Sequence, residues 1–273
     1  DNVCLPEIKE THHFSDKTSY LKGLDLYFEN FNITNATTHI GEVDPSYSLE
    51  KEYYKRIKST FPQIPYFIFI IRKPLERAYS HYLMSKLRGY EKLDFNMALN
   101  KEKTRISEDN SNYSILHHGY YERSSYYKYI EKFKSVFPQS NPLFIKFEDL
   151  FNENKRENVF NDIVDYLEIE CKTNNLNLDI AENKASTYKS LFMQKLLYED
   201  FFVKKILKRL LPARSITKIK IYLSKINMKE INDSDKVNPI TLVEDKFIYL
   251  NNDITEKLEK LINLDLSNWY YDK

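Results

Sequence analysis

Glycine is scarce in this sequence. Only Gly23, Gly41, Gly89 and Gly119 occur among 273 residues, whereas glycine usually makes up about 7% of a protein. Neither a GxGxxG fingerprint nor a GxxxxGK(S/T) loop is present, and in both of these motifs the glycines let the backbone approach a phosphate closely. A glycine-rich phosphate loop therefore lies outside this sequence or does not exist.

Cysteines, excess charge and long apolar runs are also lacking. Cys4 and Cys171 do not have the spacing of metal ligands, and a lone pair does not make a disulfide framework. With 41 basic and 40 acidic residues the net charge is +1, so we expect no nucleic-acid partner. The longest apolar run, Ile64–Ile71, is far shorter than the roughly 20 residues of a membrane span. We therefore expect a soluble protein.

An alternation of predicted strands and helices is present instead. Short, almost continuously apolar runs are typical of buried parallel strands, and apolar residues repeating every three or four positions indicate helices. Strands are predicted over Thr38–Val43, Gln63–Arg72 and Pro142–Phe147, and helices over Ser48–Thr60, Pro74–Arg88, Tyr126–Phe137, Arg156–Leu167 and Ile254–Leu264. This order predicts one α/β domain over residues 1–273, with a mostly parallel central sheet covered on both faces and a helical C-terminal third.

The segment IFIIRKPLERAYSHY, residues 68–82, joins a predicted strand to a predicted helix. In open α/β sheets, ligands bind at the carboxyl ends of strands, where helix N-termini offer free N–H groups. Arg72 ends the strand, and Arg77 and Ser80 share one helix face. Arginine binds phosphate through two charge-assisted hydrogen bonds, and serine adds a neutral donor. The alternative is an ordinary amphipathic helix with solvated basic side chains and an Arg72–Glu76 ion pair.

A second candidate is the segment KETHHFSD, in which Glu10 lies close to His12. A carboxylate beside an imidazole can act as a general base that takes a proton from an attacking hydroxyl or amine. The segment could also be half of a metal site, but it supplies too few ligands at usable spacing. The remaining alternative is a polar loop that leads into a helix.

Two further segments carry polar side chains. The turn GEVDPSY, residues 41–47, offers a Glu and an Asp that either position a substrate or cap the following helix. His117 and His118 are adjacent, and adjacent side chains on a helix point about 100° apart. We therefore expect no metal site at these histidines.

Together these segments resemble the motifs of one enzyme family. IIRKPLERAYSHYL is similar to the 3′-phosphate-binding motif of the sulfotransferases that use 3′-phosphoadenylyl sulfate (PAPS), and Arg72 and Ser80 keep its spacing. LPEIKETHHFSD resembles the segment that carries the catalytic Glu in heparan-type carbohydrate sulfotransferases, and GEVDPSY resembles their GE-x-x-P-x-Y turn. HHGYYERSSYYKYIEKFKSVFP, PLFIKFEDL and NLDLSNWYY resemble the family's Gly-Tyr helix, acidic strand end and tryptophan-containing end. The matches run from Lys9 to Tyr270.

The resemblance implies a P-loop-like three-layer α/β/α fold and an enzyme that transfers a sulfuryl group from PAPS to a hydroxyl or amine, leaving 3′-phosphoadenosine 5′-phosphate (PAP). It assigns the catalytic base to Glu10 and a neighbouring active-site histidine to His12. Arg72 and Ser80 would hold the 3′-phosphate of the donor, with Arg77 as a helper. No metal is implied, and the segment around Glu10 favours a carbohydrate acceptor.

Two features depart from the family pattern. The N-terminal phosphosulfate loop, which carries a conserved Lys, would precede Asp1 and is missing, so we expect this sequence to be a fragment that begins after that loop. The Lys-Gly-x-x-Arg loop of the heparan-type enzymes has no counterpart. In its place Phe202–Ile226 is a basic amphipathic stretch, which is a solvated face, a lid over an acidic substrate or a membrane-surface contact.

Other classes of protein stay open at this stage. A non-catalytic relative would bind a nucleotide or glycan without turnover. A P-loop nucleotide kinase would share the strand–helix phosphate site, although the residues from Arg72 to Ser80 fit such a kinase poorly. A cytoplasmic bacterial location is favoured, with the Golgi lumen as the alternative. The Asn-x-Ser/Thr sequons are about as many as chance gives; they begin at Asn32, Asn35, Asn112 and Asn232.

Overall fold

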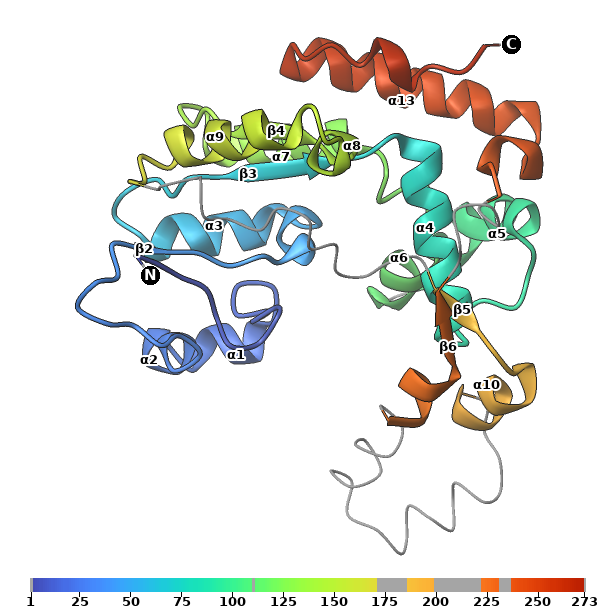
Figure 1. The fold of residues 1–273 in the computed structure, drawn as a ribbon, viewed down its shortest axis with the longest axis horizontal. Coiled ribbons are helices and arrows are strands. Elements are labelled where there is room, and N and C mark those ends of the chain that lie inside the picture. Colours follow the sequence, from blue (N-terminus) through green and yellow to red (C-terminus); the bar gives the residue numbers. More distant parts are fainter. Residues whose placement is uncertain (1, 110, 171–185, 199–221, 231–236, 273) are drawn as a thin grey trace, which may run out of the picture. The chain divides into compact units, whose positions relative to one another are not determined.

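The computed structural model describes residues 2–109, 111–170, 186–198, 222–230 and 237–272. Within them the chain forms two compact units, one from residues 1–69 and 126–144 and the other from residues 70–125 and 145–273. Figure 1 labels the helices and strands of both. Helices dominate and the strands are short, so the fold is a mixed α/β fold with small sheets.

The first unit contains a short parallel strand pair. β1 (Val3–Cys4) pairs with β2 (His39–Ile40), with Val3 opposite His39. β3 (Ile68–Ile71) pairs with β4 (Leu143–Lys146), and the division between the units passes through both of these strands. The helices of this unit are α1 (Lys17–Leu21), α2 (Leu24–Phe28), the 3₁₀ helix η1 (Pro45–Ser48), α3 (Lys51–Thr60) and α7 (Tyr126–Val136).

Aromatic side chains form the core of the first unit. Tyr54 of α3 meets Phe133 and Phe137 nearly edge-on, with ring centroids 5.4 and 6.4 Å apart, a geometry that aromatic pairs favour. Lys58 Nζ donates to the carbonyl of Val136 at 2.8 Å. The buried face of α7 that its sequence spacing predicts is therefore the face that packs on α3.

The second unit is mainly helical. Its helices are α4 (Pro74–Leu87), α5 (Phe95–Glu108), α6 (Tyr113–His118), α8 (Phe147–Phe151), α9 (Arg156–Tyr166), α10 (Leu191–Tyr198), α13 (Asp245–Ile262) and the 3₁₀ helices η4 (Pro239–Leu242) and η5 (Ser267–Trp269). β5 (Ser186–Tyr188) pairs antiparallel with β6 (Met228–Glu230). Asn251 is fully buried; it accepts from Leu75 N–H at 3.0 Å and donates to the Trp269 carbonyl at 2.9 Å. This one amide joins the start of α4, α13 and the C-terminal segment.

The sequence predicted the helices better than the strands. α4, α7 and α9 lie where their patterns place them, while α13 begins earlier than predicted, at Asp245. β3 begins only at Ile68, because Pro62 and Pro65 have no N–H to donate to a ladder. The expected mostly parallel sheet is not continuous in the described residues, where three two-stranded sheets occur and the β5–β6 pair is antiparallel.

The C-terminal third also differs from its prediction. It contains β5 and β6 besides its helices, so it is not wholly helical. Most of the basic stretch Phe202–Ile226, as well as Cys171, lies outside the described residues. No helix in the described ranges combines the length and the hydropathy that crossing a bilayer requires.

Gly119 is a position that only glycine fits. A Cβ atom built there would lie 2.5 Å from the backbone carbonyl oxygen of Ile115, whereas at Gly41 the nearest atom is a Leu5 side-chain carbon at 3.6 Å. We expect Gly119→Ala to lower the free energy of unfolding by about 1–3 kcal/mol, since overpacking against backbone cannot relax by a rotamer change. Gly41→Ala is the matched control and stays close to wild type. Urea denaturation measures both, and equal losses would contradict this assignment.

Glu102 is a buried carboxylate on α5. Its Oε2 accepts from the N–H of Tyr121 at 3.1 Å and its Oε1 from the N–H of Glu122 at 2.7 Å, yet burial raises its pKa to about 7. Between the ordinary pKa and this value, the folded protein holds a proton that the unfolded chain has lost. The contribution of Glu102 to the free energy of unfolding is therefore fully present below about pH 4.5. It decreases as the pH rises towards 7, by about 3 kcal/mol in all.

Glu102→Gln tests this dependence, because glutamine mimics the neutral acid. We expect the difference between the free energies of unfolding of the variant and of wild type to increase in favour of the variant by up to about 3 kcal/mol from pH 5 to pH 8. Glu108→Gln, at the exposed end of the same helix, is the control and tracks wild type. A constant difference between Glu102→Gln and wild type across this pH range would show that Glu102 is ionised in the fold throughout.

Candidate functional site

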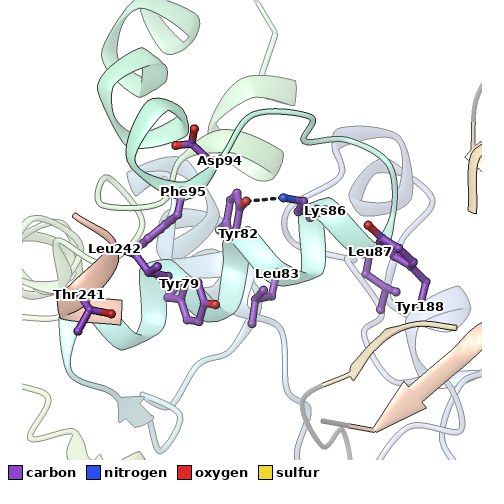
Figure 2. Close-up of a pocket in the computed structure, with 10 residues that line it drawn as sticks. All are labelled: Tyr79, Tyr82, Leu83, Lys86, Leu87, Asp94, Phe95, Tyr188, Thr241 and Leu242. Atoms are coloured by element: carbon purple, nitrogen blue, oxygen red, sulfur yellow. Dashed lines mark hydrogen bonds between the residues drawn. The ribbon is translucent and has the colours of Figure 1, made fainter. Parts of the chain in front are cut away.

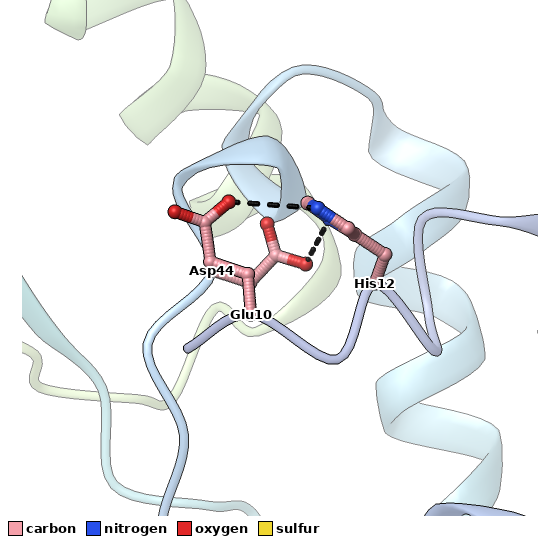
Figure 3. Close-up of side chains that lie close together, drawn as sticks. All are labelled: Glu10, His12 and Asp44. Atoms are coloured by element: carbon pink, nitrogen blue, oxygen red, sulfur yellow. Dashed lines mark hydrogen bonds and ion pairs between the residues drawn. The ribbon is translucent and has the colours of Figure 1, made fainter. Parts of the chain in front are cut away.

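Glu10, His12 and Asp44 lie together in the first unit, as Figure 3 shows. His12 Nδ1 is 2.9 Å from Asp44 Oδ2, and His12 Nε2 is 3.5 Å from Glu10 Oε2. The Asp44 side chain is fully buried, whereas that of Glu10 is 30% exposed. The imidazole is thus held between two carboxylates, of which only one faces solvent.

Local backbone geometry produces this arrangement. His12 has φ = 52°, in the left-handed region that non-glycine residues seldom adopt. The chain then turns, and the N–H of Asp16, the cap of α1, donates to the His12 carbonyl at 2.8 Å. Asp44 comes from the GEVDPSY turn, where its Oδ1 accepts from the N–H of Ser46 at 2.8 Å and caps η1. Asp44 therefore caps the turn, which is one of the two alternatives that the sequence left open, and it also contacts His12.

A second carboxylate of the same turn holds the loop between Glu10 and His12. Glu42 Oε2 accepts from the Thr11 hydroxyl at 2.5 Å, and Glu42 Oε1 accepts from Tyr47 at 2.7 Å and from Tyr27 at 3.2 Å. Burial raises the pKa of Glu42, and the three hydroxyl donors oppose that rise. Three hydrogen bonds to one carboxylate fix Thr11, and with it the directions of its two neighbours.

The Glu10, His12 and Asp44 group can accept a proton at Glu10. In the described part of the chain it is also the one group of three potential metal ligands, with ligand atoms within 4.8 Å of one another. KETHHFSD by itself supplies too few ligands because the third potential ligand, Asp44, lies 32 positions beyond His12. The same contacts suit a base with its orienting partners, so we assign no metal.

Arg72 lies in the second unit, between β3 and α4. Its Nε and Nη2 donate to Glu76 Oε2 at 3.3 and 3.2 Å, and its guanidinium carbon lies 4.9 Å from the centre of the Phe147 ring. The ion pair that the sequence analysis gave as an alternative is therefore formed. Because the Arg72 and Glu76 side chains are 32% and 42% exposed, an anion in solution can compete with Glu76 for the guanidinium.

Arg77 is engaged more deeply. Its Nη1 donates to the Tyr120 carbonyl at 3.3 Å and lies 3.4 Å from His81 Nδ1. Burial, with Arg77 and Arg123 nearby, lowers the pKa of His81 to about 2, so the ring is neutral. Because His81 Nε2 donates to the Leu116 carbonyl at 2.9 Å, its Nδ1 accepts from Arg77. These contacts fix Arg77 to the fold.

Ser80 lies one turn beyond Arg77 on α4, as predicted, and it is exposed. Its hydroxyl has no hydrogen-bond partner in the described part of the chain and can donate to a ligand. One N–H that the sequence analysis expected to be free at the start of α4 is used, since Leu75 donates to Asn251. The structure brings together Arg77 and Ser80 on one helix, and Glu10 and His12 in one loop.

A further pair of sequence motifs meets in the second unit. The indole N–H of Trp269 donates to Glu148 Oε1, so the tryptophan-containing end contacts the acidic pair that follows β4. Trp269 is 1% exposed. His117 stacks on Tyr90 with ring centroids 4.1 Å apart, and His118 Nε2 lies 3.0 Å from the Tyr90 carbonyl. The His117 ring therefore has a packing role, and the His118 ring contacts a backbone carbonyl.

Comparison with known proteins gives a similarity to a solved structure. No family model matches the chain, and no curated protein matches it. The chain is similar to the crystal structure of a sulfotransferase from Alicyclobacillus acidocaldarius, with a TM-score of 0.60, 18% identity, and coverage of 98% of this chain and 88% of that one. The two share a fold. At this identity the similarity is one of fold alone.

Proposed function

We propose that this chain is a sulfotransferase that moves a sulfuryl group from PAPS to a hydroxyl or amine of an acceptor, with a carbohydrate as the favoured acceptor. The observation that carries the proposal is the fold similarity to a sulfotransferase over 98% of the chain. The order of the sequence motifs from Lys9 to Tyr270 supports it independently. A P-loop-like three-layer arrangement and a single sulfotransferase domain belong to the same proposal.

Glu10 acts as the general base in this proposal. Its half-exposed carboxylate takes the proton of the acceptor hydroxyl as the oxygen attacks the sulfur, and the bond from sulfur to the donor's phosphate oxygen breaks in line. His12 orients Glu10, and Asp44 orients His12 from the buried side. Thr11, fixed by Glu42, keeps Glu10 and His12 at this geometry.

Arg72 and Ser80 bind the 3′-phosphate of PAPS in this proposal. The guanidinium exchanges its Glu76 partner for phosphate oxygens, and the free Ser80 hydroxyl adds a neutral hydrogen bond. Arg77, held by Tyr120 and His81, contributes positive charge to the same helix face. No metal takes part in these roles.

A transfer assay tests the proposal directly. The protein in its complete reading frame is incubated with PAPS labelled in the sulfate group and with desulfated polysaccharides as acceptors, and with labelled ATP in a parallel reaction. We expect label to move from PAPS to polysaccharide and not from ATP. Transfer of phosphate from ATP would instead support a nucleotide kinase, and binding of PAP without any transfer would support a non-catalytic relative.

A further inference from the structure

A pocket of about 550 Å³ opens along α4 in the second unit (Figure 2). Its walls come from α4, the start of α5, β5 and η4. The volume lies within the range of about 300–1,000 Å³ that is typical of small-molecule sites. None of the five residues that we assign to catalysis or donor binding lines it.

Four of the ten residues that line this pocket are aromatic. The rings of Tyr79 and Tyr82 are nearly parallel, at 19°, with centroids 6.0 Å apart. Phe95 closes one side, with its ring 5.0 Å from Tyr79 and 5.1 Å from Tyr82. Tyr188 of β5 and Leu83 complete the apolar lining on the other side. Flat aromatic faces of this kind suit a ligand ring.

One cation, Lys86, lines the pocket. Lys86 Nζ donates to the Tyr82 hydroxyl at 2.8 Å and lies 5.2 Å from the centre of that ring. Tyr82 in turn donates to the Leu93 carbonyl, so the ammonium is held in place by an oriented neutral acceptor. Lys86 is half-buried, and within the described ranges it forms no ion pair. Burial opposes its charge, but the Tyr82 hydrogen bond and nearby acidic groups raise the pKa of Lys86, so it stays protonated.

We propose that this pocket binds a ring-bearing organic anion, whose ring lies against Tyr79 and whose sulfate, phosphate or carboxylate group pairs with Lys86. The half-buried Lys86 ammonium forms no ion pair in the described residues, and such a ligand supplies both a ring for the aromatic wall and a negative charge for the ammonium. Asp94, at the rim, disfavours ligands with several negative groups.

The pocket is distinct from the proposed donor site. Successive residues of a helix are about 100° apart, so Tyr79, Tyr82 and Lys86 centre on a face nearly half a turn away from the face of Arg77 and Ser80. The inference does not rest on the proposed function, because it needs no donor and no transfer.

Binding of 4-nitrophenyl sulfate tests the inference, measured by isothermal titration calorimetry on an Arg72→Ala background that disables the donor site. We expect saturable binding at least tenfold tighter than that of neutral 4-nitrophenol. Lys86→Met removes this preference, and Tyr79→Ala weakens both ligands. Glucose 6-sulfate in a third arm distinguishes a sugar ring from an aromatic one, since tighter binding of either probe identifies the ring type.

Lys101→Met, on the exposed face of α5, is the matched control for loss of one positive charge and leaves binding unchanged. The inference is overturned if neither sulfate ester binds at millimolar concentration, or if both bind equally well to Lys86→Met. A circular dichroism melt of each variant shows that the fold persists. If the Arg72→Ala background itself abolishes binding, the probe occupies the donor site and the pocket is not the anion site.

Discussion

Glu10→Gln is expected to reduce sulfate transfer by about a hundredfold or more while leaving the affinity for PAP nearly unchanged. Glutamine keeps the size and the polarity of the side chain but cannot accept a proton at neutral pH. General base catalysis contributes about 10²–10⁴ in rate, so the loss falls on kcat. The measurement is initial-rate kinetics with a saturating acceptor, together with a PAP titration of the same preparation.

The matched control for Glu10→Gln is Glu7→Gln. Glu7 is exposed and lies in the same segment. Glu7→Gln therefore removes the same charge at a residue that does not contact His12. We expect it to retain nearly full activity. His12→Gln is predicted to fall between these two variants, because it removes the group that orients Glu10 and not the base itself. Full activity of Glu10→Gln with the natural acceptor would rule out the base assignment.

Local features of the fold could be predicted from the sequence. α4 follows from Pro74 at its first position and from the apolar strand before it, and the placing of Arg77 and Ser80 on one face follows from helical spacing. α7 follows from the spacing of its apolar residues. In each case the information lies within about 15 residues, which is the range over which periodicity acts.

Contacts between distant parts of the chain could not be predicted in this way. His12 meets Asp44 across 32 positions, and Thr11 meets Glu42 across 31. Both carboxylates belong to a turn that the sequence marks as polar, but no spacing rule joins that turn to a loop so far before it. The strand before α4 was overestimated for a different reason, because Pro62 and Pro65 have no N–H to donate to a ladder, and Ile64 and Tyr66 beside Pro65 are exposed.

The Arg72–Glu76 pair shows how the two interpretations of one motif combine. The sequence left open whether Arg72 binds phosphate or pairs with Glu76, and the structure contains the pair. Since surface ion pairs contribute only about 0–1 kcal/mol and two bonds to a phosphate contribute more, the pair does not prevent phosphate binding. In the proposed function, Glu76 holds the guanidinium in place until the donor's phosphate displaces it.

Arg72→Ala is therefore expected to weaken PAP binding by about a hundredfold or more. Two charge-assisted hydrogen bonds, each contributing about 1.5–3 kcal/mol, are lost, and each 1.4 kcal/mol is a factor of ten in Kd. Isothermal titration with PAP measures the change. Ser80→Ala is predicted to weaken binding by about tenfold, since it loses one neutral donor.

Glu76→Gln separates the phosphate role of Arg72 from a purely structural role. If Glu76 competes with the phosphate, its removal tightens PAP binding by up to about fivefold, the equivalent of a surface ion pair. If Arg72 only anchors α4 through Glu76, then Glu76→Gln and Arg72→Ala both lower the melting temperature. They then do not shift the Kd for PAP in opposite directions. Arg88→Ala, at the exposed C-terminal end of α4, controls for the loss of one positive charge on the same helix. Opposite shifts in Kd for Arg72→Ala and Glu76→Gln are the result that only a phosphate-binding Arg72 produces.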